Sequence, residues 1–413
     1  MCVKLLYTCI DMFKKTTNRN FLWQQPTIHW LLTGLFVLML LGLLFSRALL
    51  SISMAVWFIT IIAFQLQHPF PKEKHPLLYW SIMPLGLFVV GAWQLPFQKD
   101  TYDFLLNLCT YPIAFFAVRL LYASIDGNKI IRIWIVVAFL SSIYPLSWYV
   151  THFQEAVIKY GSGQSMPVWM DHDHIRYSIF LCSAFALLLF HYPFSNKFRL
   201  PVVVATFLLI VFLSVRTAWV ILAIMLLFIP FLKTIPYRKW LTIGIIAIAC
   251  CSYFIFPTVQ KKIAYTLYDW QQFKPAVFNS NYSDGARRNL NDIAVEAIQH
   301  KSYNVGWAGV APTMQQYGKK YFPQQPMQFG WPFNQWLFWL LGSGWIGMLL
   351  WSTWLLYPIL WGIQQQQFGI TAWTIAISAS CLVESNLNFQ FGVFLHAWPL
   401  AMMALYPAQD NKR

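Results

Sequence analysis

The feature that most constrains this chain is a series of long apolar stretches, since a helix needs roughly 20 mostly apolar residues to cross a bilayer. Such stretches cover residues 28–45, 48–66, 77–93, 104–122, 131–150, 175–191, 200–213, 218–232, 240–256, 333–360, 368–383 and 391–406. They predict an all-α polytopic membrane protein with about twelve transmembrane helices. The tenth stretch is over-long and contains Gly342, Ser343 and Gly344, so we expect a bend or break there.

The composition supports this class and excludes others. Of the 413 residues, 58% are hydrophobic and 10% are charged, against roughly 45–50% and about 25% in soluble domains. So few charges cannot keep a soluble chain of this size dispersed. A soluble enzyme, a disordered regulator and a nucleic-acid-binding domain are therefore excluded, despite the formal charge of +15, and we expect no nucleic-acid partner.

The positions of the cations predict the topology. Lysines and arginines concentrate on alternate connections, for example Lys72, Lys74, Lys129 and Arg132. The positive-inside rule places that side, with both termini, in the cytoplasm. The basic start shows no small-residue cleavage site, so we expect the first span to be an uncleaved anchor.

This topology divides the chain into three parts. Residues 1–256 form a bundle of helices 1–9, residues 257–332 form a large outer loop with short helices, and residues 333–413 form helices 10–12 and a cytoplasmic tail. A second outer segment covers residues 151–174. Within the large loop, the spacing of Leu290, Ile293 and Ala297 predicts an amphipathic helix. We expect a small helical layer over the bundle.

Three arginines stand out at the outer helix ends, where charges near the membrane are costly and tend to be functional. Arg216 sits in a turn too tight to carry its side chain far from the bilayer. Arg287 and Arg288 open the predicted loop helix, where backbone N–H groups and guanidinium donors favour an anion. The alternatives are a headgroup anchor for Arg216 and a solvated charge pair for the other two.

A histidine and a carboxylate complete the candidate set. His174 and Arg176 precede or open the sixth helix, and we interpret them as a proton acceptor and an anion ligand; a wet interfacial loop is the alternative. Alternating Asp and His over residues 171–174 do not preform a tetrahedral site, so we expect no metal. No P-loop or dinucleotide fingerprint occurs, and we expect no cofactor. Glu384 should have a cationic partner, either in a structural ion pair or as a catalytic acid or base.

These residues share the predicted outer face, where the large loop carries eight lysines and arginines against four acidic residues. Arginine presents fixed, bidentate donors to phosphate groups. A basic pocket at the outer boundary of a lipid-embedded bundle fits a lipid-linked diphosphate whose tail stays in the bilayer. The lipid bilayer and such a donor are therefore the expected partners.

Several short motifs, in order over residues 170–400, carry a family resemblance. They are Ser214-x-Arg216-Thr217-Ala218, the arginine opening the loop helix, the turn Gly306–Gly309, and the segment Glu384-Ser385 with Gln390-x-Gly392. With the twelve-helix frame, this set resembles the O-antigen ligase and polymerase superfamily of bacterial envelope proteins.

The resemblance implies a GT-C-like, metal-independent, inverting glycosyltransferase of the bacterial inner membrane, with its active site facing the periplasm. It would move a glycan from undecaprenyl diphosphate to an acceptor hydroxyl, most simply lipid A-core in O-antigen ligation. A growing polysaccharide or a protein serine are alternative acceptors. The resemblance implies that Arg216 and Arg287 or Arg288 hold the diphosphate. Arg176, interpreted above as an anion ligand from its place at the helix start, would assist them.

The chain departs from the family at one position. The family usually shows His-Asn after the long loop, whereas this chain reads Phe333-Asn334. Either His174 has taken over as the base, or activation needs no strong base, or this member is inactive or has another acceptor. We favour His174 as the base, with Asn334, Gly306 and Glu384 in supporting roles. A flippase or exporter of polyprenyl-linked glycan is the alternative from another class, because it too would need an arginine-lined cavity.

Overall fold

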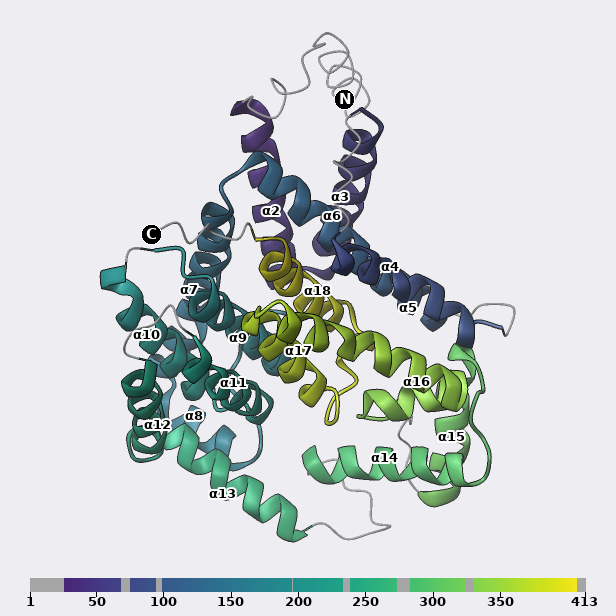
Figure 1. Cartoon of the computed structure of the whole chain (residues 1–413). Coiled ribbons are helices and arrows are strands. Elements are labelled where there is room, and N and C mark those ends of the chain that lie inside the picture. The colour runs from purple at the N-terminus through teal and green to yellow at the C-terminus, as the bar shows by residue number, and fades with distance from the viewer. Residues whose placement is uncertain are drawn as a thin grey trace.

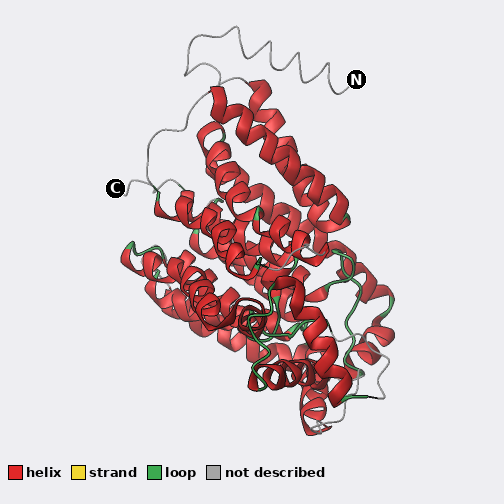
Figure 2. Ribbon diagram, turned by 90° about the vertical axis from the view of Figure 1, so that its right-hand side faces the viewer, coloured by secondary structure: helices red, strands yellow, loops and turns green. Residues whose placement is uncertain are grey.

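The computed structural model describes residues 26–67, 75–93, 99–194, 196–232, 238–272, 283–323 and 330–406, and over these ranges its regular elements are all helices (Figures 1 and 2). Helices occupy all twelve predicted apolar stretches. Their bounds are α2 (Pro26–Phe45), α3 (Arg47–Gln67), α4 (Pro76–Phe88) with η2 (Val89–Gly91), α5 (Lys99–Leu108) with α6 (Thr110–Ser124), α7 (Gly127–Thr151), α9 (His174–Phe190), α10 (Arg199–Phe212) preceded by η3 (Asn196–Phe198), α11 (Arg216–Phe228) with η4 (Ile229–Phe231), α12 (Arg238–Ile255), α16 (Gln335–Gln364), α17 (Phe368–Ser380) and α18 (Gln390–Leu405).

The lengths of these helices divide them into two groups. Among the described residues, six are long and apolar enough to cross a membrane, with α5 and α6 taken as one, and six others are apolar but shorter. The all-α polytopic class is thereby confirmed. The number of crossings stays a prediction.

Contacts between helix ends and connecting segments occur at two ends of the bundle. At one end, the Tyr406 hydroxyl donates to Asn128 Oδ1 at 2.7 Å, joining the ends of α18 and α7. At the other end, Met170 N donates to Leu44 O at 2.8 Å and Arg47 Nε lies 2.6 Å from Asp171 Oδ2. Which end faces the cytoplasm still rests on the positive-inside rule.

Aromatic side chains tie the bundle together. Trp80 of α4 and Trp354 of α16 stack with centroids 5.0 Å apart, and each indole N–H donates to the other residue's carbonyl at 2.6 and 3.1 Å. Burying an indole is favourable when its N–H finds a partner. This reciprocal contact fixes α16 against the N-terminal half of the bundle.

The predicted break in α16 is confirmed at Gly344, which has φ of 69° and ψ of −174°. Backbone N–H groups of Val305 and Gly306 donate to the carbonyls of Leu341 and Gly342 at 2.8 and 2.9 Å, satisfying groups that an interrupted helix leaves without intrahelical donors. Gly306 itself has φ of 75°, a conformation that glycine adopts readily. The glycine turn therefore approaches the backbone of α16.

A layer of short helices covers one end of the bundle, the lower end in Figure 1. It comprises α8 (Phe153–Gly161), α13 (Pro257–Gln272), α14 (Ser283–Gln299), η5 (Trp307–Gly309) and α15 (Val310–Tyr321). Helix α8 packs on α13, and α14 packs on both α15 and α16. The predicted stripe of α14 is buried, since Ile293, Ala294 and Ala297 are all 0% exposed. Four of these five elements, α13, α14, η5 and α15, thus lie within residues 257–332.

Candidate functional site

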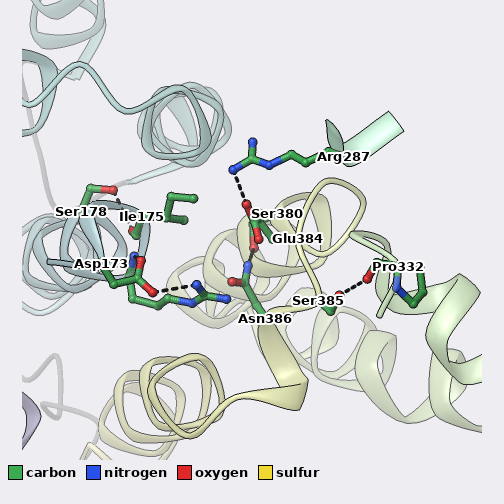
Figure 3. Close-up of polar contacts among 10 residues, drawn as sticks. Asp173, Ile175, Ser178, Arg287, Pro332, Ser380, Glu384, Ser385 and Asn386 are labelled. Atoms are coloured by element: carbon green, nitrogen blue, oxygen red, sulfur yellow. Dashed lines mark hydrogen bonds and ion pairs between the residues drawn. The ribbon is translucent and has the colours of Figure 1, made fainter. Parts of the chain in front are cut away.

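Glu384 lies in the connection between α17 and α18, which includes η6 (Asn386–Asn388), and it is 2% exposed. Hydrogen bonds fix this connection (Figure 3): Asn386 Nδ2 donates to Ser380 Oγ at 2.8 Å, and the Ser385 hydroxyl donates to Pro332 O. The backbone N–H of Glu384 donates to Ser380 O at 3.0 Å. The buried carboxylate is therefore held on a rigid segment.

The start of α16 supports the same connection. Buried Gln335 donates from Nε2 to Asn388 Oδ1 at 2.8 Å and accepts from Leu387 N at 3.0 Å. Asn334 Oδ1 accepts from Trp336 N and Leu337 N at 2.9 and 3.2 Å, which caps the helix. Its amide nitrogen donates to Leu382 O at 3.1 Å. These contacts give Asn334 a scaffolding position.

Arg287 supplies the cationic partner expected for Glu384. Its Nη2 lies 2.5 Å from Glu384 Oε1, and the two side chains point toward each other (Figure 3). The aromatic ring of Phe333 lies 5.5 Å from the guanidinium carbon. Phe333, which stands where the resembled family has histidine, therefore packs against the arginine and offers no proton acceptor.

Arg288 lies elsewhere. Its side chain is exposed, and its charge acts on Asp292, one turn along α14, where it opposes the rise in the pKa of that carboxyl that burial causes. The sequence contained the signal that separates the two arginines. Arg287 lies three residues before Leu290 and seven before Ala294, so it shares the buried stripe, whereas Arg288 does not.

The start of α9 brings a second arginine–carboxylate pair. Asp173 Oδ1 accepts from Arg176 N at 3.0 Å and caps the helix, and its Oδ2 lies 2.7 Å from Arg176 Nη1. The guanidinium carbon of Arg176 lies 4.9 Å from the centre of the Phe389 ring. Phe389 is the last residue of the connection that carries Glu384. The Arg176–Asp173 pair therefore lies beside the Arg287–Glu384 pair.

Lys262 of α13 adds a third cation that the sequence analysis did not single out. It is 4% exposed, and its Nζ donates to Gly163 O at 3.1 Å. The sequence contained a signal for the burial of Lys262. On α13 the buried residues Thr258, Lys262, Tyr265 and Asp269 are three or four positions apart, which is typical of a helix face directed inward.

The charges of these groups act on the pKa values of His174 and Glu384. Burial lowers the pKa of His174, just before the predicted span 175–191, to about 4; Lys262, Arg287 and Arg176 add to this lowering and Asp173 opposes it. Burial raises the pKa of Glu384, and Arg287 and Arg176 oppose that rise. We call the set Asp173, His174, Arg176, Lys262, Arg287 and Glu384 the polar cluster.

Arg216 flanks the polar cluster. It begins α11 after a turn in which Ser214 adopts φ of 54°, and its Nη1 donates to Thr266 Oγ1 at 3.3 Å. Thr266 lies one turn beyond Lys262 on α13, and its hydroxyl donates to Lys262 O at 2.7 Å. Arg216 is half-buried at this contact.

The structure thus brings together His174, Arg176, Arg287 and Glu384 of the predicted site residues and places Arg216 beside them. Arg288 and Gly306 lie outside the cluster, and Asn334 caps α16 next to it. In the segment of alternating Asp and His, Asp171 pairs with Arg47 and Asp173 with Arg176. The polar cluster holds three fixed cations against two carboxylates, and Arg216 beside it adds a fourth cation. This excess of positive charge suits an anionic group that carries more than one negative oxygen.

Comparison with known proteins adds one match. A family model described as O-antigen ligase matches residues 201–352. The matched residues include Arg216, Lys262 and Arg287, but not His174, Arg176 or Glu384. No curated protein matches the chain.

Proposed function

We propose, on the premise that the chain belongs to the O-antigen ligase family through residues 201–352, that it moves a glycan from undecaprenyl diphosphate to an acceptor hydroxyl. The family is one of membrane glycosyltransferases of the ligase and polymerase type. Within it, we propose ligation of O-antigen to lipid A-core at the periplasmic side of the bacterial inner membrane. The observation that supports this most is the polar cluster around Arg287 and Glu384.

The reaction requires what the polar cluster offers. Displacement at the anomeric carbon leaves negative charge on the departing diphosphate, and fixed donors aimed at those oxygens lower the barrier. Arg287 and Arg176 carry permanent charge and present several N–H donors each. We assign the diphosphate to these two guanidinium groups, with Lys262 and Arg216 on the α13 side.

We propose that the reaction is metal-independent and inverting. Guanidinium groups supply the charge stabilisation that a divalent ion supplies elsewhere, and a diphosphate departs without a general acid. Direct displacement by the acceptor oxygen inverts the anomeric carbon. Activity that survives EDTA would support this assignment, and activity lost with EDTA and restored by a divalent ion would refute it.

His174 has a different task in this proposal from the one first assigned to it. A proton acceptor is most effective when its pKa lies near the working pH, whereas the pKa of His174 is lowered to about 4. A neutral imidazole still offers a hydrogen bond at neutral pH. We therefore propose that His174 orients the acceptor hydroxyl.

The experiment that tests the function separates transfer from transport. Purified protein in lipid vesicles receives an undecaprenyl-diphosphate-linked glycan and a panel of acceptors, including lipid A-core. Release of undecaprenyl diphosphate together with a glycan–acceptor product is expected. Movement of the donor across the bilayer without a new glycosidic bond would refute the transferase and support a flippase.

A further inference from the structure

We propose that Glu384 is the base that activates the acceptor, and that it is released for this task when the donor's diphosphate displaces it from Arg287. This inference rests on the proposed function. In it, the Glu384 carboxylate first occupies the anion site and then accepts the proton of the acceptor hydroxyl.

The first step of the argument is the position of the carboxylate. Glu384 Oε1 lies 2.5 Å from Arg287 Nη2, so the carboxylate occupies a guanidinium nitrogen to which a phosphate oxygen would otherwise bind (Figure 3). The exposed fractions differ, at 23% for the Arg287 side chain and 3% for that of Glu384. A ligand therefore reaches the arginine more easily than the carboxylate, and competition takes place at the guanidinium.

The second step concerns which partner gives way. Glu384 sits on a connection held by hydrogen bonds from Asn386 and Ser385, so its carboxylate stays near the site after losing its partner. Arg287 reaches the cluster from α14 on a long side chain with several donors. A small rotation of the guanidinium toward a phosphate would leave Glu384 buried and without its closest cation.

The third step follows from electrostatics. Arg287 is the main charge that opposes the rise in the pKa of Glu384 caused by burial. Once Arg287 engages the diphosphate, that opposition weakens and the carboxylate becomes a stronger proton acceptor. Donor binding would thus activate the base, and a hydroxyl would be deprotonated only when a donor is in place.

Other members of the polar cluster are less suited to the task. Asp173 caps α9 with one oxygen and pairs with Arg176 through the other. Burial and the charges of Lys262, Arg287 and Arg176 disfavour the protonated form of His174 and lower its pKa. Glu384 is the remaining carboxylate of the cluster, and it is the more deeply buried of the two.

The step balances in atoms and charge. The acceptor O–H bond breaks and its proton passes to a Glu384 oxygen, while the acceptor oxygen forms a bond to the anomeric carbon. The bond from the anomeric carbon to the diphosphate oxygen breaks, and its electron pair leaves with undecaprenyl diphosphate. Protonation removes one negative charge from Glu384 as the diphosphate gains one, so the cluster's positive charge grows where it is needed.

The test is Glu384→Gln in the full-length protein, because glutamine keeps the shape but neither competes as an anion nor accepts the proton. Farnesyl diphosphate is the binding probe. We expect it to bind about tenfold more tightly, since an ion pair no longer has to be displaced. We expect undecaprenyl diphosphate release at saturating donor and acceptor to fall by about 10²-fold or more.

Glu155→Gln is the matched control, because Glu155 has an exposed side chain that pairs with Lys159 within α8, and it lies outside the polar cluster. It should change neither quantity. If Glu384→Gln weakens probe binding, the carboxylate only positions Arg287 and the proposal is wrong. If transfer continues at the rate of the unchanged protein, Glu384 is not the base.

A folding defect is measured separately, from the melting temperature with and without the probe. The proposal expects farnesyl diphosphate to raise the melting temperature of Glu384→Gln more than that of the unchanged protein; an equal or smaller rise contradicts it. If the unchanged protein transfers no glycan, the proposed function fails. The binding comparison needs no acceptor and still decides whether Glu384 occupies the diphosphate site.

Discussion

Replacing Arg287 with alanine would separate the structural contribution of this residue from its chemical one. The substitution removes the closest cation from Glu384, whose side chain is 3% exposed and whose Oε1 lies 2.5 Å from Arg287 Nη2. The carboxylate would then be buried with Arg176 as its remaining nearby arginine. We expect a less stable protein that no longer transfers glycan.

The magnitude follows from the geometry. Removing one partner of a fully buried ion pair costs about 3–5 kcal/mol, because a charge is left unpaired. Arg287 is 23% exposed, so water fills part of the gap, and we expect about 2–3 kcal/mol. For a protein of this size, such a loss lowers the melting temperature by a few degrees.

The double variant Arg287→Ala/Glu384→Gln sharpens the test. It removes the unpaired charge as well as its partner, so at least half of the lost thermal stability should return, while transfer stays absent. Both quantities can be measured on detergent-purified protein, by thermal unfolding and by release of undecaprenyl diphosphate. A double variant as unstable as Arg287→Ala alone, or an Arg287→Ala protein with unchanged melting temperature, would refute the reasoning.

The remaining predictions concern other residues of the site and the scaffold. Arg216→Ala should lower transfer by about 10²-fold, which is the usual cost of removing one donor from a developing anion. The melting temperature should stay nearly unchanged, because the side chain is only half-buried. Turnover equal to that of the unchanged protein would remove Arg216 from the site. His174→Gln should leave the shape of the rate profile between pH 6 and pH 8 unchanged, because His174 is already neutral there; a profile that changes shape would show that His174 titrates in this range. The same variant should lose less thermal stability than the unchanged protein as the pH falls from 6.5 toward 4, because a histidine with a lowered pKa takes up its proton in the unfolded chain before the folded one. Gly344→Ala should lower the melting temperature, because φ is 69° and the added carbon would lie 3.1 Å from Asn304 Cβ; Gly34→Ala in α2, where an added carbon meets nothing within 4 Å, is the control.

Most of the fold was predictable because its main signals are local. Each apolar stretch indicates a helix by itself, although among the described residues only six of the helices are long enough to cross a membrane. The interruption of α16 follows from a glycine cluster that continuous helices avoid. The helices begin and end a few residues from the predicted bounds, and the fourth predicted stretch forms two helices, α5 and α6, which are joined at Cys109. The stripe on α14 was also readable, since periodicity reports burial directly.

The site was predictable only in part because its contacts are not local. The pairing of Arg287 with Glu384 joins α14 to the α17–α18 connection, and no spacing rule connects these segments. In the sequence Lys262 is one of eight cations in the large loop, and its burial on α13 distinguishes it only in the folded structure. Asn334 and Gly306 matched the resembled motifs, yet their hydrogen bonds hold α16 and its break. A motif identifies a position, whereas only the packing shows whether the side chain meets a ligand or the scaffold.

The most direct test of the central claim compares two neighbouring arginines in one assay. Undecaprenyl diphosphate release that depends on an acceptor is measured for Arg287→Ala and for Arg288→Ala, whose side chain is exposed outside the polar cluster. The account predicts loss of release in the first variant and nearly unchanged release in the second. Equal activity of the two variants, or loss in Arg288→Ala alone, would contradict it.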